Sequence, residues 1–550
     1  MRIPETVDGV VVGAGCNGLV AANLLADAGW HVVVLEAAGE PGGAVRSVEG
    51  LTSPGFVSDL FSAFYPLGAA SPVLQRLDLA SYGLRWSHAP LVLAHPFPDG
   101  RCAVLSRDLD ETAASLDAFA PGDGDTWRRV YAGWERLAPR FVAALFRPFP
   151  PVRDGVGLAR TLGVAGGLRF ARFAVQPVRR YAEEEFRGEG AALLLAGNAL
   201  HTDLPPEGAG SAVFGWLLAM LGQQVGFPVP VGGAGALVEA LVARLKARGG
   251  ELRVNAEVTE VLVHGGRAAG VRTRDGSVVR ARHGVLADVA APQLFLDLVG
   301  REHLPARLVA DLARFQWDNS TVKVDWALSG RIPWRCADAG RAGTVHVGGE
   351  LDELTAYADA LTRRRVPARP FLVVGQMTTS DATRSPVGTE SVWAYTHVPQ
   401  EVRGDDRNVI KGSWDGDDVA AMVDRIEDEL ERHAPGFRAL ITGRHVLTPT
   451  GMQDRDRNLV RGAINAGTAA LHQQLVFRPV PGLGRPETPV DRLYLAGASA
   501  HPGGGVHGAS GANAARAALL HAGWAGPVAG AAIRAAHRLV YGRADAAEPG

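Results

Sequence analysis

Three glycines near the N-terminus have the spacing of a phosphate-binding loop. Gly13, Gly15 and Gly18 follow directly on an apolar, β-branched run that is typical of a buried parallel strand. In this G-x-G-x-x-G pattern the first glycine permits a tight turn, the second lets the backbone approach a pyrophosphate, and the third lets helix and strand pack closely. Cys16, where a small spacer suffices, and Asn17 also belong to this loop.

An acid at the end of the next strand completes this motif. The helix predicted over 19–28 would direct its N-terminal N–H groups at the phosphates, and Gly29 ends it. A second strand is predicted over 31–35, and Glu36 closes that strand. A carboxylate there can accept hydrogen bonds from both ribose hydroxyls and would repel a 2′-phosphate. A lone G-x-G-x-x-G would be weak, but strand, turn, helix, strand and acid together predict a dinucleotide site.

A second glycine turn follows shortly after the acid, at Gly42 and Gly43. A nicotinamide enzyme does not need this element. In flavoproteins with an N-terminal βαβ unit, a double glycine here lets the backbone pass close to the cofactor. From this turn Arg46 could reach a phosphate or a flavin, or it could lie on an ordinary surface turn.

The C-terminal part of the chain contains a second glycine-rich loop. A strand is predicted over 493–496, Gly497 begins the loop, and a helix is predicted to start near 506–508. The N-terminus of that helix would stabilise the negative charge on the pyrimidine end of a reduced flavin. His501 and His507 are the candidates for a catalytic acid or base, although they could equally hydrogen-bond the flavin or the backbone. The loop also contains Gly503, Gly504, Gly505 and Gly508.

The bulk composition is that of an ordinary globular protein. The chain has 550 residues, of which 47% are hydrophobic and 21% charged, enough for two or more domains. A net charge of −2 gives no general attraction to nucleic acid. Cys16, Cys102 and Cys336 are isolated in sequence, so no redox dithiol or zinc site is predicted. The histidines lack the spacing of metal ligands, and no metal is predicted.

No secretion signal or membrane span is evident, so a cytoplasmic location is expected. The segment 140–181 is exceptional because its arginines are interleaved with phenylalanines and accompanied by a single acid, Asp154. This pattern suits peripheral contact with an anionic membrane surface. The alternative is a solvated helical face whose arginine stems cover apolar surface.

The chain divides into segments by pattern. A first cofactor-binding segment is predicted over 1–71, a mostly helical substrate segment over 72–227, and a second cofactor-binding segment over 228–291. Mixed helices and strands over 292–485 would complete the substrate domain, and 486–525 would return to the cofactor. The tail, 526–550, is expected to be partly disordered. The apolar helix expected over 211–223 suits buried core or the wall of an apolar substrate tunnel.

Four stretches carry a family resemblance: GAGCNG with Glu36, PGGAV at 41–45, PVGGAGALVEAL followed by GGELRVNAEVTEVLV, and LYLAGASAHPGGGVHGASG. The chain resembles the phytoene-desaturase-like branch of the flavin amine oxidase and Rab GDP-dissociation-inhibitor superfamily. NALHTDLPP at 198–206 and HQQLVFRPVPG at 472–482 are similar to its bacterial pyridine nucleotide-disulphide oxidoreductase domain-containing subgroup. That subgroup name does not suit this chain, in which a redox-active cysteine pair is missing from the sequence.

The resemblance implies an α/β fold with a discontinuous Rossmann-like FAD-binding domain and a mixed α+β substrate domain. It also implies residues that hold FAD along its whole length: Gly13, Gly15 and Gly18 at the pyrophosphate, Glu36 at the ribose, Gly43 near the cofactor, Val258 at the adenine through its backbone, and Gly497, Gly505, Val506, His507 and Gly508 at the far end. Members of the family have an apolar substrate tunnel, and many sit on membranes.

Three functions are compatible with this resemblance. The first is an FAD-dependent dehydrogenase, desaturase or isomerase that acts on a small hydrophobic, isoprenoid-like or natural-product substrate, with O₂, a quinone or NAD as electron acceptor. The second is a flavin amine oxidase, which an aromatic cage would favour. The third is a non-catalytic lipid or prenyl chaperone on the same fold. It ranks last because the three glycines and Glu36 of the FAD motif are all retained.

Overall fold

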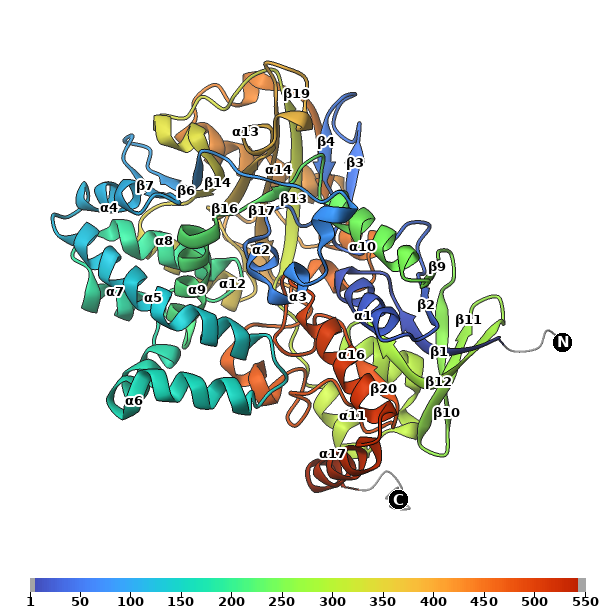
Figure 1. The fold of residues 1–550 in the computed structure, drawn as a ribbon. Coiled ribbons are helices and arrows are strands. Elements are labelled where there is room, and N and C mark those ends of the chain that lie inside the picture. The colour runs from blue at the N-terminus through green and yellow to red at the C-terminus, as the bar shows by residue number, and fades with distance from the viewer. Residues whose placement is uncertain (1–4, 543–550) are drawn as a thin grey trace.

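The computed structural model describes residues 5–542 and contains two large sheets (Figure 1). The first sheet has the strand order β10-β11-β12-β1-β2-β9, and β20 pairs with β12 beside that path. Its strands are β1 (Glu5–Val12), β2 (Val32–Leu35), β9 (Glu251–Arg253), β10 (Val258–His264), β11 (Arg267–Thr273), β12 (Val278–Ala287) and β20 (Leu493–Leu495). Distant parts of the chain therefore build one sheet.

The strand β12 is longer than its apolar pattern indicates. The segments 278–281 and 285–287 are two mostly apolar runs, and Arg282 and His283 lie between them. The structure instead has one continuous strand that runs parallel to β1 along its length and antiparallel to β11 at its start. Both polar side chains reach Asp8 on the neighbouring strand, at 3.0 Å and 4.0 Å, so the strand is not interrupted.

Helices cover both faces of the first sheet. On one face the apolar side chains of α1 (Cys16–Asp27), α10 (Gly235–Ala247) and α16 (Ala509–Ala522) form one core with the strands. On the other face α11 (Ala306–Leu312) and the segment Gln293–Val299 pack against the sheet. This arrangement of helices on both sides of a mostly parallel sheet is the predicted Rossmann-like fold.

The second sheet forms the substrate domain, in the order β19-β13-β17-β16-β14-β6-β7. Its strands are β6 (Leu91–Pro96), β7 (Cys102–Leu105), β13 (Ser320–Leu328), β14 (Ala342–Val347), β16 (Leu372–Gln376), β17 (Glu390–Val398) and β19 (Ile441–Leu447). The helix α14 (Gly416–His433) packs on one face. The helices α8 (Glu189–Leu200), α9 (Ser211–Val225) and α12 (Leu351–Thr362) contribute to the core on the other face.

The region from residue 72 to 227 is only partly as predicted. Helices do dominate it, including α4 (Leu109–Asp117), α5 (Asp123–Leu145), α6 (Val152–Val175) and α7 (Val178–Glu185). The strands β6 and β7, however, lie in the same region and extend the second sheet. The strand β6 pairs with β14, which comes much later in the chain, and β7 pairs with β6. Helical periodicity gives no indication of these pairings.

The C-terminal segment also differs from its prediction. Residues Gly526–Tyr541 form the helix α17, where a partly disordered tail was expected. Tyr541 anchors it, because its hydroxyl donates a hydrogen bond of 2.5 Å to the carbonyl of Pro481. The remainder of the predicted tail, from residue 543, lies outside the described residues.

Candidate cofactor and substrate site

The two glycine-rich loops, far apart in sequence, meet where α1 and α16 begin. A Cβ atom added to Gly511 would collide with the backbone carbonyl of Asn17. One added to Gly508, which has a φ of +68°, would lie 2.8 Å from a methyl carbon of Val20. Only residues without side chains let the two helices approach this closely. Both loops therefore border the same crevice.

Steric constraints explain why a glycine stands at each of the three positions of the N-terminal loop. Gly13 has a φ of +91°, and a Cβ on Gly18 would collide with the carbonyl oxygen of Gly13. A Cβ on Gly15 would lie 2.6 Å from the carboxylate of Asp288. Next to this turn, the Glu36 carboxylate accepts hydrogen bonds from the N–H groups of Ala14 at 2.7 Å and residue 38 at 2.8 Å. These contacts fix the acid at the strand end where the ribose is predicted.

Asp288 is a buried acid that the sequence analysis did not identify. It directly follows β12, and its Oδ2 accepts a hydrogen bond of 2.7 Å from the N–H of Gly18. Burial raises the pKa of Asp288 to about 7, and the nearby carboxyls of Asp456 and Glu36 add to the rise. The carboxyl therefore exchanges its proton in the neutral pH range, beside the predicted pyrophosphate site.

This acid gives the affinity for FAD an expected pH dependence. Below pH 7 Asp288 is mostly protonated and neutral, whereas above pH 7 its carboxylate would repel a bound pyrophosphate. The dissociation constant of FAD is expected to rise between pH 6 and pH 9, as measured by flavin fluorescence titration of the apoprotein. Asp288→Asn should flatten this dependence, and an unchanged slope in the variant would assign the effect to another group.

A cavity of about 340 Å³ extends from the glycine loops to the second sheet. The predicted cofactor residues that line it are Gly15, Cys16, Asn17, Gly42, Gly43, Gly505 and Val506. The predicted residues that do not line it are Gly13, Gly18, Glu36, Arg46, Val258, Gly497, His501, His507 and Gly508. The opposite wall comes from β13, β14, β16 and β17, and it includes Thr321, Lys323, Thr344, Val373, Trp393 and Tyr395.

The cavity has the features that FAD would require. The side-chain oxygen of Asn17 and the side-chain amide nitrogen of Asn465 are buried and lack a hydrogen-bond partner among the described residues. Both residues border the cavity. The N-cap residue of α1, Gly15, has no side chain, and the first turn of the helix contains no acid. Apart from the N–H of Gly18, which donates to Asp288, the N–H groups of this turn can therefore bind an anion. Bare glycine backbone, free polar groups and a helix N-terminus fit a flavin dinucleotide.

The wall from the second sheet is polar on one face only. Along β13, Thr321 and Lys323 line the cavity, whereas Val322 and Val324 pack in the core beneath α14. Lys323 is buried, and its ammonium donates to Asp325 at 2.5 Å and to the carbonyl of residue 59 at 3.0 Å. Its charge is therefore balanced inside the wall.

Two histidines form a pair at the edge of this wall. The Nε2 atoms of His201 and His346 are 2.7 Å apart, so one ring donates a hydrogen bond and the other accepts it. Burial lowers the pKa of His201 to about 3 and that of His346 well below its usual value, which keeps the pair neutral. Gly197 makes room for the pair, because a Cβ there would collide with the His346 ring.

The predicted catalytic histidines lie behind the cavity wall. The Nδ1 of His507 accepts a hydrogen bond of 3.0 Å from the N–H of Ala509, and its ring packs on Phe146. His501 packs against the ring of Phe149. Burial lowers the pKa of both histidines to about 4, so both are neutral. Catalysis by these residues stays a prediction, but their placement favours a role in shaping the loop.

The side chain of Arg46 stabilises the glycine turn from which it extends. Its guanidinium donates to the carbonyl oxygens of Gly43 at 2.9 Å and Arg455 at 2.8 Å, and it pairs with Glu40 at 3.1 Å. Val258 is buried at the start of β10, close to the point where the N–H of Ala256 donates 2.8 Å to the backbone carbonyl of Glu36. Contact of either residue with a cofactor stays a prediction.

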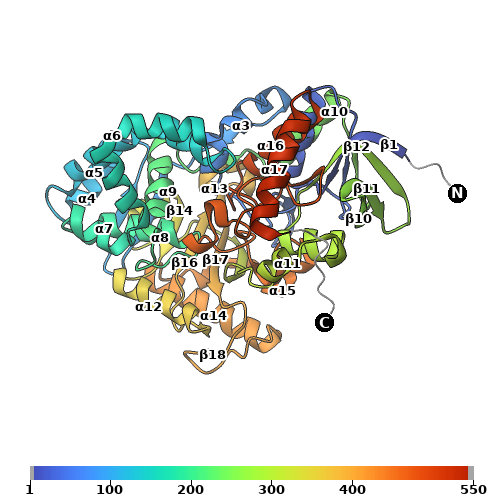
Figure 2. The ribbon, with the colours of Figure 1, turned by 90° about the horizontal axis from the view of Figure 1, so that it is seen from below.

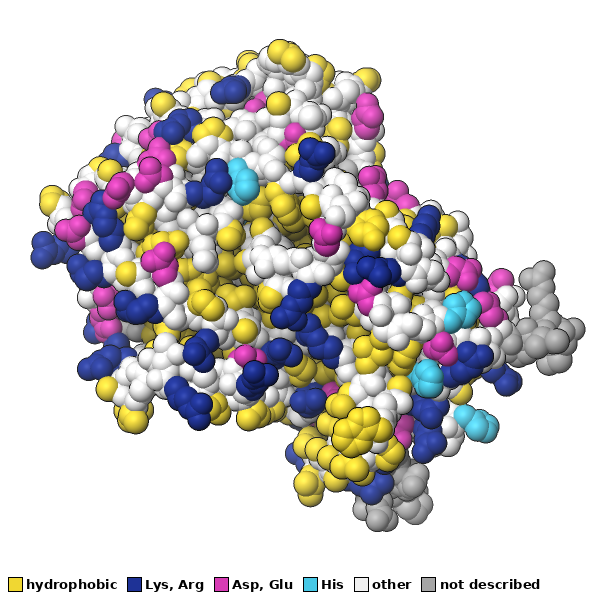
Figure 3. Space-filling view, viewed as in Figure 1, with side chains coloured by type: hydrophobic (Ala, Val, Ile, Leu, Met, Phe, Trp, Pro, Cys, Tyr) yellow, Lys and Arg dark blue, Asp and Glu magenta, His cyan; other side chains and the backbone are white. Residues whose placement is uncertain are grey.

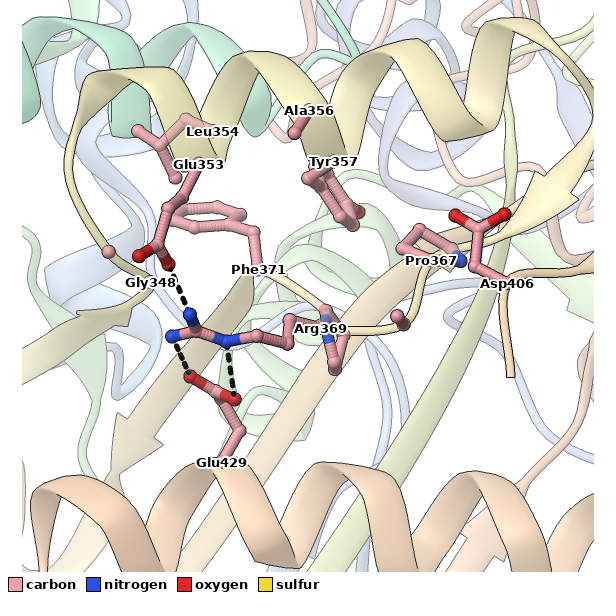
Figure 4. A pocket seen from close by; sticks show the side chains of 13 residues that line it. Gly348, Glu353, Leu354, Ala356, Tyr357, Pro367, Arg369, Phe371, Asp406 and Glu429 are labelled. Carbon is pink, nitrogen blue, oxygen red and sulfur yellow. Dashed lines mark hydrogen bonds and ion pairs between the residues drawn. The ribbon is translucent and has the colours of Figure 1, made fainter.

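A second hollow, of about 210 Å³, lies between α12 and α14 (Figure 4). In Figure 4 the guanidinium of Arg369 lies between Glu353 and Glu429, at 2.8 Å and 3.1 Å. Tyr357 and Phe371 form its apolar side. The arginine is already neutralised, and neither of the two glycine-rich loops of the cofactor site borders this hollow.

Two of the cysteines, predicted to be isolated, are in contact. A hydrogen bond between the thiols of Cys102 and Cys336 lowers the pKa of Cys336 to about 6. Both residues belong to the core beneath α14, and neither lines the cavity. They are far apart in sequence and show no C-x-x-C spacing, so their contact depends on the pairing of β7 within the second sheet. The pair is not part of the cofactor site.

Comparisons with known proteins agree with this geometry. The sequence profile of flavin containing amine oxidoreductases matches residues 18–294. The pyridine nucleotide-disulfide oxidoreductase domain-containing protein 2 of Rattus norvegicus is 30% identical over 92% of both chains. A neurosporene-forming phytoene desaturase of Rhodobacter capsulatus is 27% identical over 90% of both chains. The crystal structure of an oxidoreductase from Methanosarcina mazei has a TM-score of 0.60, is 16% identical and covers 93% of this chain and 99% of its own.

Proposed function

This chain belongs to the family of flavin-containing amine oxidoreductases, and we propose that, as an FAD-dependent oxidoreductase, it dehydrogenates a hydrophobic, isoprenoid-like substrate. The observation that carries this proposal is the cavity that joins both glycine loops to the second sheet. FAD, when bound, supplies a two-electron acceptor for a hydride. The chain itself must bind the substrate, orient it and exclude water.

The lining of the cavity supports an apolar substrate. Large hydrophobic side chains contribute to it from both sides, among them Phe61, Phe64, Leu67, Leu218, Phe227 and Met452. Their burial against an apolar ligand would supply the binding energy. The apolar helix predicted over 211–223 corresponds to α9, which is largely buried and contributes Leu218 to this wall. Its role as the wall of a substrate tunnel stays a prediction.

An amine oxidase has less support from the aromatic residues of the cavity. Trp393 and Tyr395 line it from β17, with nearly parallel rings whose centroids are 5.9 Å apart. An amine carbon held between two rings needs about 7 Å, which is two van der Waals contacts of about 3.5 Å each. This pair is therefore too close to form the expected cage.

The proposal is tested with the purified protein under anaerobic conditions. We expect a yellow protein with the absorbance band of oxidised flavin at about 450 nm. Isoprenoids should bleach this band, and putrescine should not. Subsequent mixing with O₂, a quinone or NAD⁺ would identify the electron acceptor. A colourless protein that binds isoprenoids would support the chaperone, and bleaching by putrescine alone would support the amine oxidase.

We also propose peripheral membrane contact, but through side chains that differ from those predicted. The phenylalanines of 140–181 pack inward, as when Phe141 and Phe173 contact Trp216. Several arginines are neutralised by acids from elsewhere, such as Arg172 by Glu184 at 2.6 Å. The exposed apolar side chains are instead Val152, Val156, Val164, Leu168 and Val175 of α6 and Trp524, Val528 and Leu539 at α17.

These two helices lie on the same side of the molecule (Figures 1 and 2). Hydrophobic side chains gather over α17, and basic ones are frequent near α6 (Figure 3). Arg153, Arg160 and Arg169 lie on α6 among its exposed valines and leucine. An apolar face with basic neighbours suits an anionic membrane surface. No helix among residues 5–542 is both long and apolar enough to cross a bilayer.

A double substitution of Val164 and Leu168 by glutamate tests this contact. Their exposed fractions are 86% and 70%, so the folded state should tolerate the change. We expect sedimentation with phosphatidylglycerol-containing vesicles to fall at least about tenfold, because burial of each side chain in the interface is worth about 1.5–3 kcal/mol. Val387→Glu, at a fully exposed valine elsewhere, is the control. Equal loss in both variants would contradict a specific role of α6.

A further inference from the structure

A buried threonine and a buried histidine face each other on the cavity side of the second sheet. Thr321 on β13 and His397 on β17 are directly opposite in the antiparallel register. The threonine Oγ1 and the histidine Nδ1 are 3.2 Å apart, and each residue is 2% exposed. Thr321 lines the cavity, so its hydroxyl connects the cavity to the imidazole.

The other nitrogen of this imidazole contacts an acid. Nε2 of His397 is 3.2 Å from Oδ1 of Asp203, although the two groups are not aligned as a straight hydrogen bond. The other oxygen of Asp203 accepts a hydrogen bond of 2.5 Å from the N–H of Asn319. Asp203 has a φ of +63°, in the left-handed region that aspartate tolerates better than most residues.

The tautomer with hydrogen on Nε2 suits both neighbours of the ring. It places an N–H toward Asp203, without an aligned hydrogen bond, and leaves the lone pair of Nδ1 to accept the hydrogen of the Thr321 hydroxyl. The backbone N–H of Asn319 holds the other oxygen of Asp203. The imidazole therefore has a hydroxyl on one side and an acid on the other, the arrangement of a proton relay in which the acid orients the ring.

Four other titratable groups surround His397 and Asp203. They are His201 and the phenols of Tyr357 and Tyr395 near the ring, and Asp318 near Asp203. Burial lowers the pKa of His201 to about 3 and raises the pKa of both tyrosines, so these three groups are neutral, and burial also raises the pKa of Asp318. Among the described residues, Asp203 is the carboxylate that pairs with the His397 ring, at 3.2 Å.

We propose that Thr321, His397 and Asp203 form a relay that removes the hydroxyl proton of an alcohol substrate, an inference that rests on the proposed FAD-dependent dehydrogenation. The substrate loses two hydrogens from neighbouring atoms. Its C–H hydrogen leaves with both bonding electrons to the flavin, and its O–H proton passes to Oγ1 of Thr321. The hydroxyl proton of Thr321 moves to Nδ1 of His397. The oxygen lone pair left on the substrate forms the C=O bond.

The residue types decide between substrate classes. A threonine hydroxyl is far too weak a base to remove a proton from carbon, so the relay has no use for a pure hydrocarbon. An amine is an ammonium ion at neutral pH and must lose a proton before it can give up a hydride. In the second sheet Asp325 is already paired with Lys323. The acids that line the cavity, Asp288 and Asp456, lie beside the N-terminal glycine turns and not in this wall. A neutral hydroxyl on an otherwise apolar molecule fits both the relay and the lining of the cavity.

The test compares three probes and four variants of the FAD-bound protein. The probes are farnesol, farnesylamine and the hydrocarbon farnesene, each mixed anaerobically with the enzyme while flavin bleaching is followed. Thr321→Val removes the hydroxyl at nearly constant shape, Thr321→Ser keeps it, and Asp203→Asn removes the charge behind the imidazole. Ser320→Ala is the matched control, because this buried neighbour has a hydroxyl without a partner among the described residues.

We expect farnesol to bleach the flavin, with a measurable solvent deuterium isotope effect. Thr321→Val should slow bleaching by about 10²–10⁴-fold, the usual contribution of a positioned proton acceptor, and abolish the isotope effect. Thr321→Ser should stay within about tenfold of the wild type. Asp203→Asn should lower the maximal rate, because the imidazole of His397 loses the acid that orients it.

Each contrary result has a distinct meaning. Bleaching by farnesene or farnesylamine but not by farnesol, or by none of the probes, overturns the alcohol relay. So does an unchanged rate with farnesol in Thr321→Val. Bleaching by farnesene would leave the proposed dehydrogenation intact, whereas a protein that binds no flavin at all would remove the proposed function itself. Equal slowing in Ser320→Ala and Thr321→Val would assign the effect to disturbed packing.

Discussion

Glu36→Arg is expected to yield a folded protein without bound FAD. The carboxylate stands at the end of β2, held by the N–H groups of Ala14 and Ala38, where the ribose hydroxyls are predicted to bind. Hydrogen bonds to a charged acceptor contribute about 1.5–3 kcal/mol each. Loss of two of them should weaken FAD binding by at least about 100-fold, since about 1.4 kcal/mol corresponds to tenfold.

The measurement is the ratio of absorbance at the flavin band to that of the protein, together with a fluorescence titration of FAD. Glu49→Arg is the control, because it reverses an exposed charge on the short strand β3 (Ser47–Glu49). Circular dichroism must show that both variants are folded. Flavin occupancy of the wild-type level in Glu36→Arg would contradict the ribose assignment.

Gly511→Ala is expected to separate the two glycine-rich loops. Its new Cβ would collide with the carbonyl oxygen of Asn17, and no side-chain rotation can relieve a clash with backbone. Displacement of α16 from α1 should lower the free energy of unfolding by about 1–3 kcal/mol, the usual cost of overpacking. Because the shift opens the crevice between the loops, FAD should be lost as well.

Gly523→Ala provides the matched control at the other end of the same helix. Its Cβ would lie 3.5 Å from the nearest atoms, which is an ordinary contact, and its φ of −82° suits alanine. The measurements are the thermal unfolding and the flavin content of both variants. Wild-type values in Gly511→Ala would show that close contact of α1 and α16 is not needed for the site.

The fold and cofactor were largely predictable because their determinants are local. The glycine spacing, the helix that follows and the acid at residue 36 lie within one βαβ unit, so adjacent residues specify the geometry. The convergence of the loop after β20 on this unit followed from the same logic, since a strand that returns to the sheet places its own loop at the same edge.

The opposite wall of the site was not predictable in the same way. Thr321 and His397 become neighbours only through the register of β13 and β17, and neither stands in a recognisable motif. Asp288 also stands in no recognisable motif, and it is identified only by its burial beside Gly18 in the structure. His501 and His507 were candidates because they lie in the glycine loop, yet neither lines the cavity. Sequence proximity to a cofactor loop does not determine which way a side chain points.

A crystal structure of the FAD-bound protein would test most directly whether both glycine-rich loops hold one FAD. We expect one FAD that spans both loops. Its ribose hydroxyls should bond to Glu36, and its isoalloxazine should lie in the cavity between Gly43 and Gly504. The substrate face of the flavin would then look toward the sheet that carries Thr321. An isoalloxazine outside this cavity, or a dinucleotide that contacts only the N-terminal loop, would contradict the assignment of both loops to one cofactor site.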